Sequence, residues 1–274
     1  MLARITQRAE REMILAWKGA RHSWSSPTAS RRRVFVAGMQ RSGTNMMMDL
    51  LERSLDTDVY HERDRRAFDN YQMRERATIQ RLSEHSQADC FVIKALCELQ
   101  QLSGLMADFA PARVVWLVRR YEDVVNSMQV SFRNMAKQAK RIAAGADPGV
   151  SGWLGEGMSA ATHAHVRRVA HEDLSDASGA ALQWYFRNVL AFDQGLHEHP
   201  DALFVGYEKL VADPERMTSR IFDFLELDHS SRITRWVHSR SVGRREPPVV
   251  DEPIRELCEA LTQRMQPLVE RDAG

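Results

Sequence analysis

Cysteine is scarce in this sequence, and the few cysteines that occur form no recognisable pattern. Cys90, Cys97 and Cys258 are an odd number without the short paired spacing of zinc ligands, so they are typical of buried thiols in a reducing compartment. Long apolar runs are lacking too, because no segment approaches the roughly 18 residues that a membrane-spanning helix needs. We therefore expect a cytoplasmic protein with no membrane span and no metal site.

An excess of charge of either sign is equally absent. Lysine and arginine together number 38, aspartate and glutamate 37, and the formal net charge is +1. This balance does not indicate nucleic acid as a partner, and any basic site must be local. With 274 residues, 43% of them hydrophobic, the chain can bury one full core. We predict a single domain over 1–274 that begins with an amphipathic helix and a polar connector over 1–30.

Short apolar runs that alternate with helical patterns predict the fold. The expected buried strands are 34–37, 90–96, 112–118 and 202–207. The expected helices start at Thr44 and near Tyr121, or cover 70–86, 179–199 and 214–227. This alternation is typical of an α/β fold with a central, mostly parallel sheet covered on both faces, here a P-loop NTPase-like three-layer α/β/α arrangement. Residues 132–178 lack a core pattern, and we predict a substrate-facing or mobile insertion there.

The segment VFVAGMQRSGTNMMMDLL (34–51) predicts a phosphate-binding loop between a strand and a helix. Backbone N–H groups in such a turn converge with a helix N-terminus and attract an anion. Compared with G-x-x-x-x-G-K-[ST], the glycines Gly38 and Gly43 fit, but Thr44 occupies the lysine position and Asn45 the magnesium-binding hydroxyl position. We expect a phosphate to bind without Mg²⁺. The predicted contacts are Gln40, Arg41, Ser42, Gly43, Thr44 and Asn45.

Further polar residues follow other strands. Arg119 comes directly after the strand 112–118, and Ser127 lies on the helix that follows. Because ligands bind at the carboxyl ends of parallel strands, the two predict a site for a second phosphate, with pairing of Arg119 to Glu122 or Asp123 as the alternative. Tyr207, at the end of 202–207, could contact a base or simply pack at the rim of the core. The loop 238–248 could close over a phosphate through Ser241, Gly243, Arg244 and Arg245.

These segments resemble, in order and spacing, those of sulfotransferases that use 3′-phosphoadenylyl sulfate (PAPS). AGMQRSGTN is similar to their 5′-phosphosulfate loop and VVWLVRRYEDVVNS to their 3′-phosphate motif. YEKLVADPERMTSRIFDFLEL and SVGRRE resemble their later segments, while the insertion is not covered. The RSGT form of the loop is closer to the tyrosylprotein and bacterial branch. The resemblance implies PAPS as donor and adenosine 3′,5′-bisphosphate (PAP) as product, with Arg119 and Ser127 on the 3′-phosphate.

The resemblance also implies a catalytic base. In the tyrosylprotein branch a glutamate follows the loop arginine by about twenty residues, which indicates Glu62, whereas the cytosolic branch uses a histidine, which keeps His61 as a rival. A carboxylate or an imidazole could remove a proton from a hydroxyl acceptor. Lys94 interrupts a buried strand and needs an anionic partner, and the resemblance supplies the transferring sulfo group. Arg41 and Lys94 would then replace magnesium.

Two other functions remain open at this point. A divergent P-loop kinase would use ATP and Mg²⁺, and a nucleotide-binding protein could keep the fold without catalysis. Our main hypothesis is sulfo transfer from PAPS to a hydroxyl or amine of a small-molecule, glycan or peptide acceptor. The sequence does not predict which acceptor is used, nor the oligomeric state.

Overall fold

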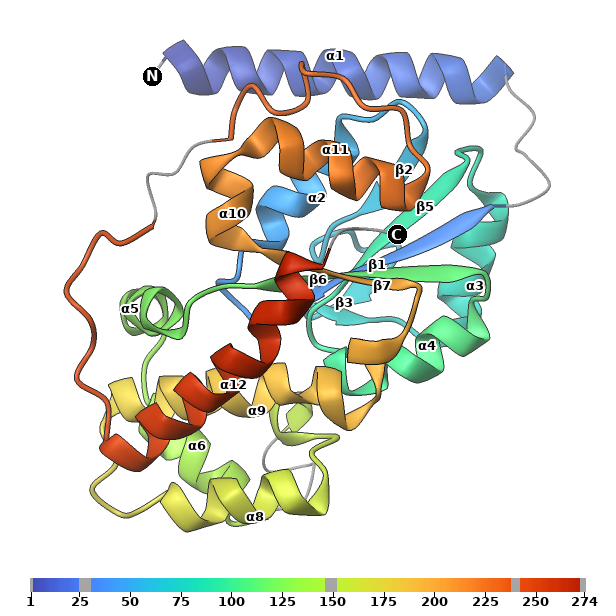
Figure 1. Ribbon diagram of the computed structural model, residues 1–274. Coiled ribbons are helices and arrows are strands. Elements are labelled where there is room, and N and C mark those ends of the chain that lie inside the picture. The colour runs from blue at the N-terminus through green and yellow to red at the C-terminus, as the bar shows by residue number, and fades with distance from the viewer. Residues whose placement is uncertain (1, 25–30, 146–151, 238–241, 272–274) are drawn as a thin grey trace.

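A five-stranded sheet in the order β2–β5–β1–β6–β7 forms the centre of the computed structural model, which describes residues 2–24, 31–145, 152–237 and 242–271 (Figure 1). Every neighbouring pair in this sheet is parallel. Its strands are β1 (Arg32–Gly38), β2 (Thr57–Tyr60), β5 (Cys90–Ala95), β6 (Ala112–Val118) and β7 (Ala202–Gly206). The predicted α/β fold with a parallel sheet is confirmed.

The strands are apolar throughout because both faces of the sheet are buried. In β1, Val34 and Val36 belong to one hydrophobic core, while Phe35 and Ala37 belong to the other. Strand β6 alternates in the same way, with Val115 on the first side and Trp116 on the second. Side chains of successive strand residues point to opposite faces, so a continuous apolar run is the expected pattern for a sheet with two cores.

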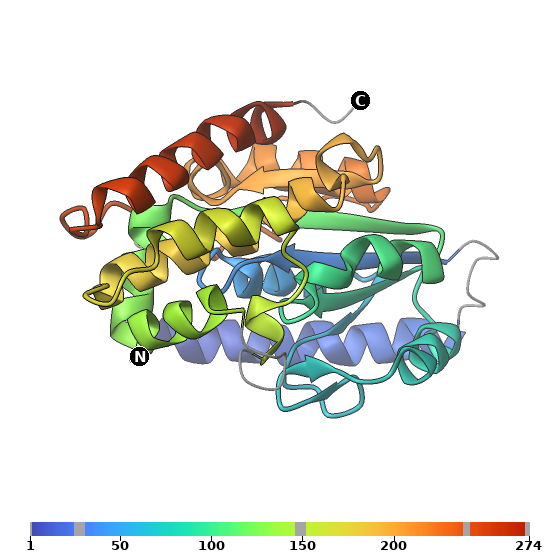
Figure 2. The same cartoon turned by 90° about the horizontal axis from the view of Figure 1, so that it is seen from below.

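Helices cover both faces and complete the three layers (Figures 1 and 2). The core that contains Val34 is closed by α2 (Thr44–Glu52), α10 (Tyr207–Ala212) and α11 (Pro214–Leu225). The core that contains Phe35 is closed by α4 (Leu102–Asp108), α5 (Tyr121–Ser131), α9 (Asp176–Asp193) and α12 (Glu252–Glu270). The short helices η1 (Leu99–Gln101), η2 (Gly152–Gly155) and η3 (Leu196–Glu198) lie in connections.

Part of the predicted insertion consists of helices packed on α9. Helices α6 (Met135–Ala143) and α8 (Ala160–Val169) bury apolar side chains against it. A Cβ at Gly179 would meet the Ala136 nitrogen at 2.6 Å, so the missing side chain lets the start of α6 approach α9. Asp176 also accepts a hydrogen bond from the Ala136 N–H at 2.9 Å. The described part of 132–178 therefore shares the core of the domain.

Three elements differ from the sequence prediction. Strand β2 was not predicted, because its few residues are mostly polar. The helix predicted over 70–86 is wrong in its first turn: a hairpin of β3 (Phe68–Asp69) and β4 (Gln72–Met73) comes first, and α3 (Arg76–His85) follows. Helix α12 was also missed, although its apolar face is visible in the sequence. Its buried residues are Ile254, Cys258, Leu261, Met265 and Leu268.

The first helix, α1 (Leu2–Trp24), lies along the outside of the domain near α11 and α2 (Figure 1). Arg11 donates to both carboxylate oxygens of Glu52 at the end of α2, at 2.5 and 2.8 Å. Lys18, which is buried, donates to the Thr57 hydroxyl of β2 at 2.9 Å. These polar contacts attach α1 to the edge of the sheet. Among the described residues, no helix is long and apolar enough to span a bilayer.

Glu98 joins the small hairpin to the chain that follows β5. Its Oε1 accepts the Met73 N–H at 2.7 Å, and only 9% of the residue is exposed. Burial raises the pKa of this carboxyl to about 7, although the Met73 N–H and the Arg187 guanidinium act in the opposite direction. Glu98 therefore ionises near neutral pH, and the unfolding free energy of the protein depends on pH in that range.

The first prediction concerns this group. Unfolded glutamate ionises near pH 4.5 and native Glu98 near pH 7. Its contribution is therefore fully present below pH 4.5 and is lost as the pH rises through 7, by about 3 kcal/mol of unfolding free energy. Glu98→Gln should remove this decline in denaturant titrations run across that range. Glu256→Gln, at an exposed position on α12, is the control, and equal pH profiles for wild type and Glu98→Gln would contradict the assignment.

Candidate functional site

A cavity of about 820 Å³ opens where the parallel strands end at their carboxyl edge. Strand β1 lies in the middle of the sheet, with β5 on one side and β6 on the other. Chain connections leave β1 and β6 toward opposite sides of the sheet, and ligands of open α/β sheets bind at such points. The loop after β1 therefore lies at the centre of the candidate site.

This loop turns sharply into α2. Arg41 and Gly43 both have positive φ, of 70° and 97°, and the helix begins at Thr44. A Cβ at Gly43 would lie 2.3 Å from the Tyr207 ring, so only glycine lets that ring pack against the loop. Ser42 is buried beneath, and its hydroxyl has no hydrogen-bond partner among the described residues. The turn directs N–H groups and the helix N-terminus into the cavity.

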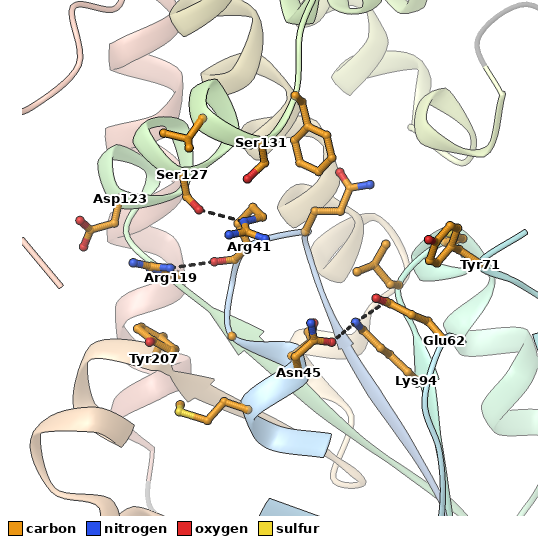
Figure 3. Close-up of a pocket in the computed structure, with 18 of the residues that line it drawn as sticks. Arg41, Asn45, Glu62, Tyr71, Lys94, Arg119, Asp123, Ser127, Ser131 and Tyr207 are labelled. Atoms are coloured by element: carbon orange, nitrogen blue, oxygen red, sulfur yellow. Dashed lines mark hydrogen bonds and ion pairs between the residues drawn. The ribbon is translucent and has the colours of Figure 1, made fainter. Parts of the chain in front are cut away.

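The predicted second phosphate site is joined directly to the loop. Arg119 donates to the Arg41 carbonyl oxygen at 3.0 Å, and its guanidinium lies 4.5 Å from the centre of the Tyr207 ring. Arg41 Nε in turn donates to the Ser127 hydroxyl at 2.8 Å. Figure 3 shows these four side chains together on one side of the cavity. The structure thus brings together residues that follow β1 and β6 with residues of α5 and α10.

Arg119 is not the surface arginine of the alternative interpretation. Only 7% of it is exposed. The neighbouring Arg120 is the residue that lies 3.5 Å from Glu122, and the Arg120 N–H donates to Glu208 at 3.0 Å. Burial raises the pKa of the Glu208 carboxyl, while that N–H contact opposes the rise. Arg119 therefore faces the loop, and its neighbour faces solvent.

Lys94 forms the centre of the opposite side. It is 2% exposed, forms an ion pair with Glu62, and donates to Asn45 Oδ1 at 2.6 Å (Figure 3). Burial lowers the pKa of the Lys94 ammonium, and the hydrogen bond to Glu62 partly offsets that effect. An ammonium has three N–H donors, so one is left for an anion in the cavity. Asn45, at the position where a P-loop binds magnesium, already accepts from Lys94.

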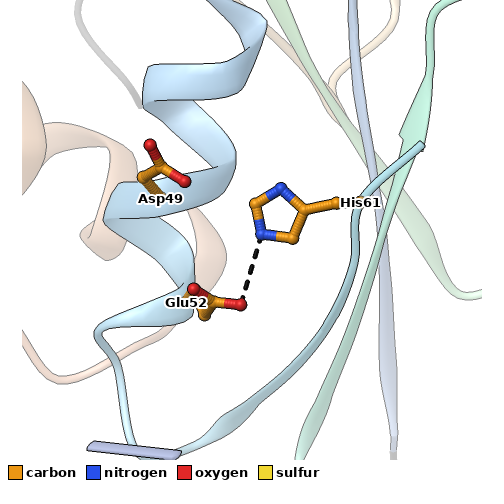
Figure 4. Close-up of side chains that lie close together, drawn as sticks. All are labelled: Asp49, Glu52 and His61. Carbon is orange, nitrogen blue, oxygen red and sulfur yellow. Dashed lines mark ion pairs between the residues drawn. The ribbon is translucent and has the colours of Figure 1, made fainter. Parts of the chain in front are cut away.

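His61 and Glu62 directly follow β2, but only Glu62 lines the cavity. The His61 Nε2 is 3.3 Å from Glu52 Oε1, outside the cavity (Figure 4). Burial opposes ionisation of Glu52, but His61 and Arg11 outweigh it and hold its pKa at about 2. Asp49, Glu52 and His61 are close enough together to suggest a metal site. However, Arg11 already occupies both Glu52 oxygens, and its positive charge opposes a metal ion there.

The basic loop near the C-terminus reaches the same cavity. Arg244 and Arg245 line it, and the Gly243 N–H donates to the Asp123 carboxylate at 3.2 Å. Asn126 donates to the Glu246 carbonyl oxygen at 3.1 Å, so α5 holds this segment at two points. Ser241 was also predicted to contribute, but it lies outside the described residues.

Most predicted residues therefore surround one cavity. Ser42 and Gly243 contribute to its frame without lining it, and His61 lies outside. The cavity is also lined by residues that the sequence did not indicate, because no local pattern distinguishes a residue that lines a cavity from one in the core or on the surface. They include Arg63, Asn70, Tyr71, Leu96, Phe132 and Trp153.

Comparison with protein-family models assigns residues 31–244 to the sulfotransferase domain. The chain belongs to the sulfotransferase family. This sulfotransferase is therefore a transferase of sulfo groups, as the resemblance implied, and family membership favours that chemistry over a kinase. No curated protein sequence matches the chain.

Two solved structures, each with a TM-score of 0.50, share the fold at low sequence identity. The sulfotransferase domain of the curacin biosynthetic pathway is 14% identical with a TM-score of 0.50, covering 86% of this chain and 99% of that chain. The sulfotransferase domain of the Synechococcus PCC 7002 olefin synthase has 14% identity and a TM-score of 0.50, with 87% and 98% covered. A sulfotransferase from Alicyclobacillus acidocaldarius has 15% identity and a TM-score of 0.49, with 89% and 98% covered. At such identities the likeness describes the fold alone.

The second prediction concerns the loop glycine. Gly43→Ala should lower the unfolding free energy of this sulfotransferase by about 1–3 kcal/mol, because the residue has positive φ and its Cβ would displace the Tyr207 ring. The affinity for PAP, the product expected from the sequence, should fall as well in calorimetric titration. Gly19→Ala on α1 is the matched control, since a Cβ there meets nothing within 4 Å. If the PAP affinity of Gly43→Ala is unchanged, the loop is not part of the PAP-binding site.

Proposed function

We propose that this sulfotransferase takes its sulfo group from PAPS and transfers it to a hydroxyl or amine of an acceptor, releasing PAP. The observation that carries the proposal is the chain of contacts Tyr207–Arg119–Arg41–Ser127. It couples the anion-binding loop to a second cationic position at the end of β6. A donor with phosphates at both its 5′ and 3′ positions matches two linked sites, whereas ATP would leave the second one unused.

The charge of the cavity supports a polyanionic donor. Among the described residues, six cationic side chains and two carboxylates line it, in a chain whose net charge is only +1. The cations are Arg41, Arg63, Lys94, Arg119, Arg244 and Arg245, and the carboxylates are Glu62 and Asp123. Positively charged side chains are concentrated in this cavity, and this concentration favours a ligand with several negative groups.

Glu62 is the acceptor base in this proposal. As the acceptor oxygen or nitrogen forms a bond to sulfur, its proton passes to the Glu62 carboxylate. The bond from sulfur to the bridging oxygen breaks, and its electron pair stays on the 5′-phosphate of PAP. Lys94, buried beside Glu62, and Arg41 lie where they can neutralise the negative charge that develops on that phosphate. Catalysis then consists of positioning and charge stabilisation.

The third prediction tests the 3′-phosphate site. Arg119→Ala should weaken PAP binding by about 2–4 kcal/mol, because a charge-assisted contact to phosphate is lost. Ser127→Ala should weaken it by about 1.5–3 kcal/mol, as expected for a hydrogen bond to a charged group. The binding free energy of adenosine 5′-phosphate, measured in parallel, should fall much less in Ser127→Ala.

Ser131→Ala is the matched control for Ser127→Ala, because Ser131 lines the cavity one helical turn further along α5. Arg119 donates to the Arg41 carbonyl and Ser127 accepts from Arg41 Nε, so the test is the difference between PAP and adenosine 5′-phosphate rather than the loss of PAP affinity alone. Equal losses for PAP and adenosine 5′-phosphate in Ser127→Ala would rule out its contact with the 3′-phosphate.

The fourth prediction separates Glu62 from His61. Glu62→Gln keeps an oxygen that can accept from Lys94 but removes the base, so kcat should fall by about 10²–10⁴ with PAP affinity retained. His61→Asn should cost much less, because His61 faces Glu52 outside the cavity. Donor hydrolysis can serve as the assay until an acceptor is known. An inactive His61→Asn beside an active Glu62→Gln would make the histidine the base.

A further inference from the structure

A strained aromatic residue lies at the cavity on the side of Glu62. Asn70 and Tyr71 form the two-residue turn between β3 and β4, and their φ angles are 46° and 67°. Such a turn strongly favours glycine at its second position, because a left-handed backbone crowds a Cβ. A tyrosine there is held at the expense of local stability. Residues kept in such conformations cluster at ligand sites.

The position of Tyr71 matches a binding role. It lines the cavity together with Glu62 and Lys94, and 53% of it is exposed. In Figure 3 its ring lies on the Glu62 side of the cavity, whereas Arg119 and Tyr207 lie on the other side. The donor contacts proposed above therefore leave this ring free for the acceptor.

Two buried side chains, Glu98 and Arg187, act as anchors. They fix the segments that carry Tyr71 and Trp153 to the chain that follows Lys94. On one side, Glu98 accepts the Met73 N–H at 2.7 Å and so fixes the hairpin of Tyr71. On the other, Arg187 of α9, 1% exposed, donates to the Leu96 carbonyl oxygen at 3.1 Å and to the Trp153 carbonyl oxygen at 3.3 Å. Its guanidinium also lies 5.1 Å from the Trp153 ring centre. Both anchors attach to the short stretch 96–98, directly after Lys94.

The end of α5 provides a third apolar wall. Val130 and Phe132 line the same cavity, with 67% and 37% of each residue exposed. Their helix is fixed to the loop by the contact between Ser127 and Arg41. Apolar surface of this kind, left open inside a cavity, is typical of a site for an apolar ligand.

We propose that the acceptor is a small hydroxylated aromatic compound whose ring binds between Tyr71 and Trp153, with its hydroxyl directed to Glu62. This inference rests on the proposed function. A sugar would need hydrogen bonds around its whole edge, whereas Leu96, Val130 and Phe132 have no side-chain hydrogen-bonding groups and would leave them to the few polar residues nearby, such as Arg63 and Asn70. A flat apolar ring with one hydroxyl matches the aromatic walls and the single base.

The experiment uses 2-naphthol as the aromatic probe and N-acetylglucosamine as the sugar probe. PAP binding is measured first by calorimetry. Each probe is then titrated into the PAP complex and tested as acceptor with PAPS. We expect 2-naphthol to bind and to be sulfated, and N-acetylglucosamine to do neither. Tyr71→Asn should raise the KM for 2-naphthol about tenfold while leaving PAP affinity unchanged, since one aromatic contact is lost.

Asparagine tolerates the left-handed conformation, so Tyr71→Asn should unfold at no lower temperature than the wild type. Tyr71→Phe should retain the KM, and Trp17→Asn, at an exposed aromatic of α1 outside the cavity, is the matched control. If PAP binds but the sugar is the better acceptor, or Tyr71→Asn leaves the KM unchanged, this inference is wrong and the proposed function stands. If PAP does not bind, both are wrong.

Discussion

The contacts of the Arg119 guanidinium hold together the side of the cavity that is proposed for the donor. The guanidinium holds the carbonyl of Arg41 and lies over the ring of Tyr207, which in turn fills the space left by Gly43. Three strand ends are thereby connected by one buried cation. Because a buried cation needs partners, the contact also positions the loop for an anion. The phosphate loop and the proposed 3′-phosphate position are consequently one unit.

A second buried cation, Lys94, holds together the opposite side of the cavity in a similar way. Lys94 is nearly inaccessible, yet it contacts Glu62 and Asn45, which come from the chain after β2 and from α2. This arrangement explains how a P-loop-like fold can lack the usual lysine and magnesium hydroxyl. The positive charge comes from a neighbouring strand, and the residue at the magnesium position serves as its hydrogen-bond acceptor.

The side of the cavity proposed for the acceptor is built differently, from segments far apart in the sequence. Glu98 attaches the hairpin of Tyr71, and Arg187 the segment of Trp153, to the chain after β5, while Ser127 fixes α5 to the loop after β1. Both anchors are buried polar side chains, and each hydrogen-bonds to backbone atoms of a segment that is distant in the sequence.

The sequence by itself determined the α/β fold and indicated most of the residues that line the side of the cavity proposed for the donor. Buried strands, glycine positions and polar residues after strand ends are local signals, and parallel strands bring their carboxyl ends to one edge. Tertiary structure alone decided that Glu62 faces the cavity while His61 faces Glu52, because both lie just beyond β2, where no strand alternation or other local signal sets which side chain points inward. It also decided where Tyr71 lies, since the hairpin depends on a contact with Glu98 that is 25 residues away in the chain.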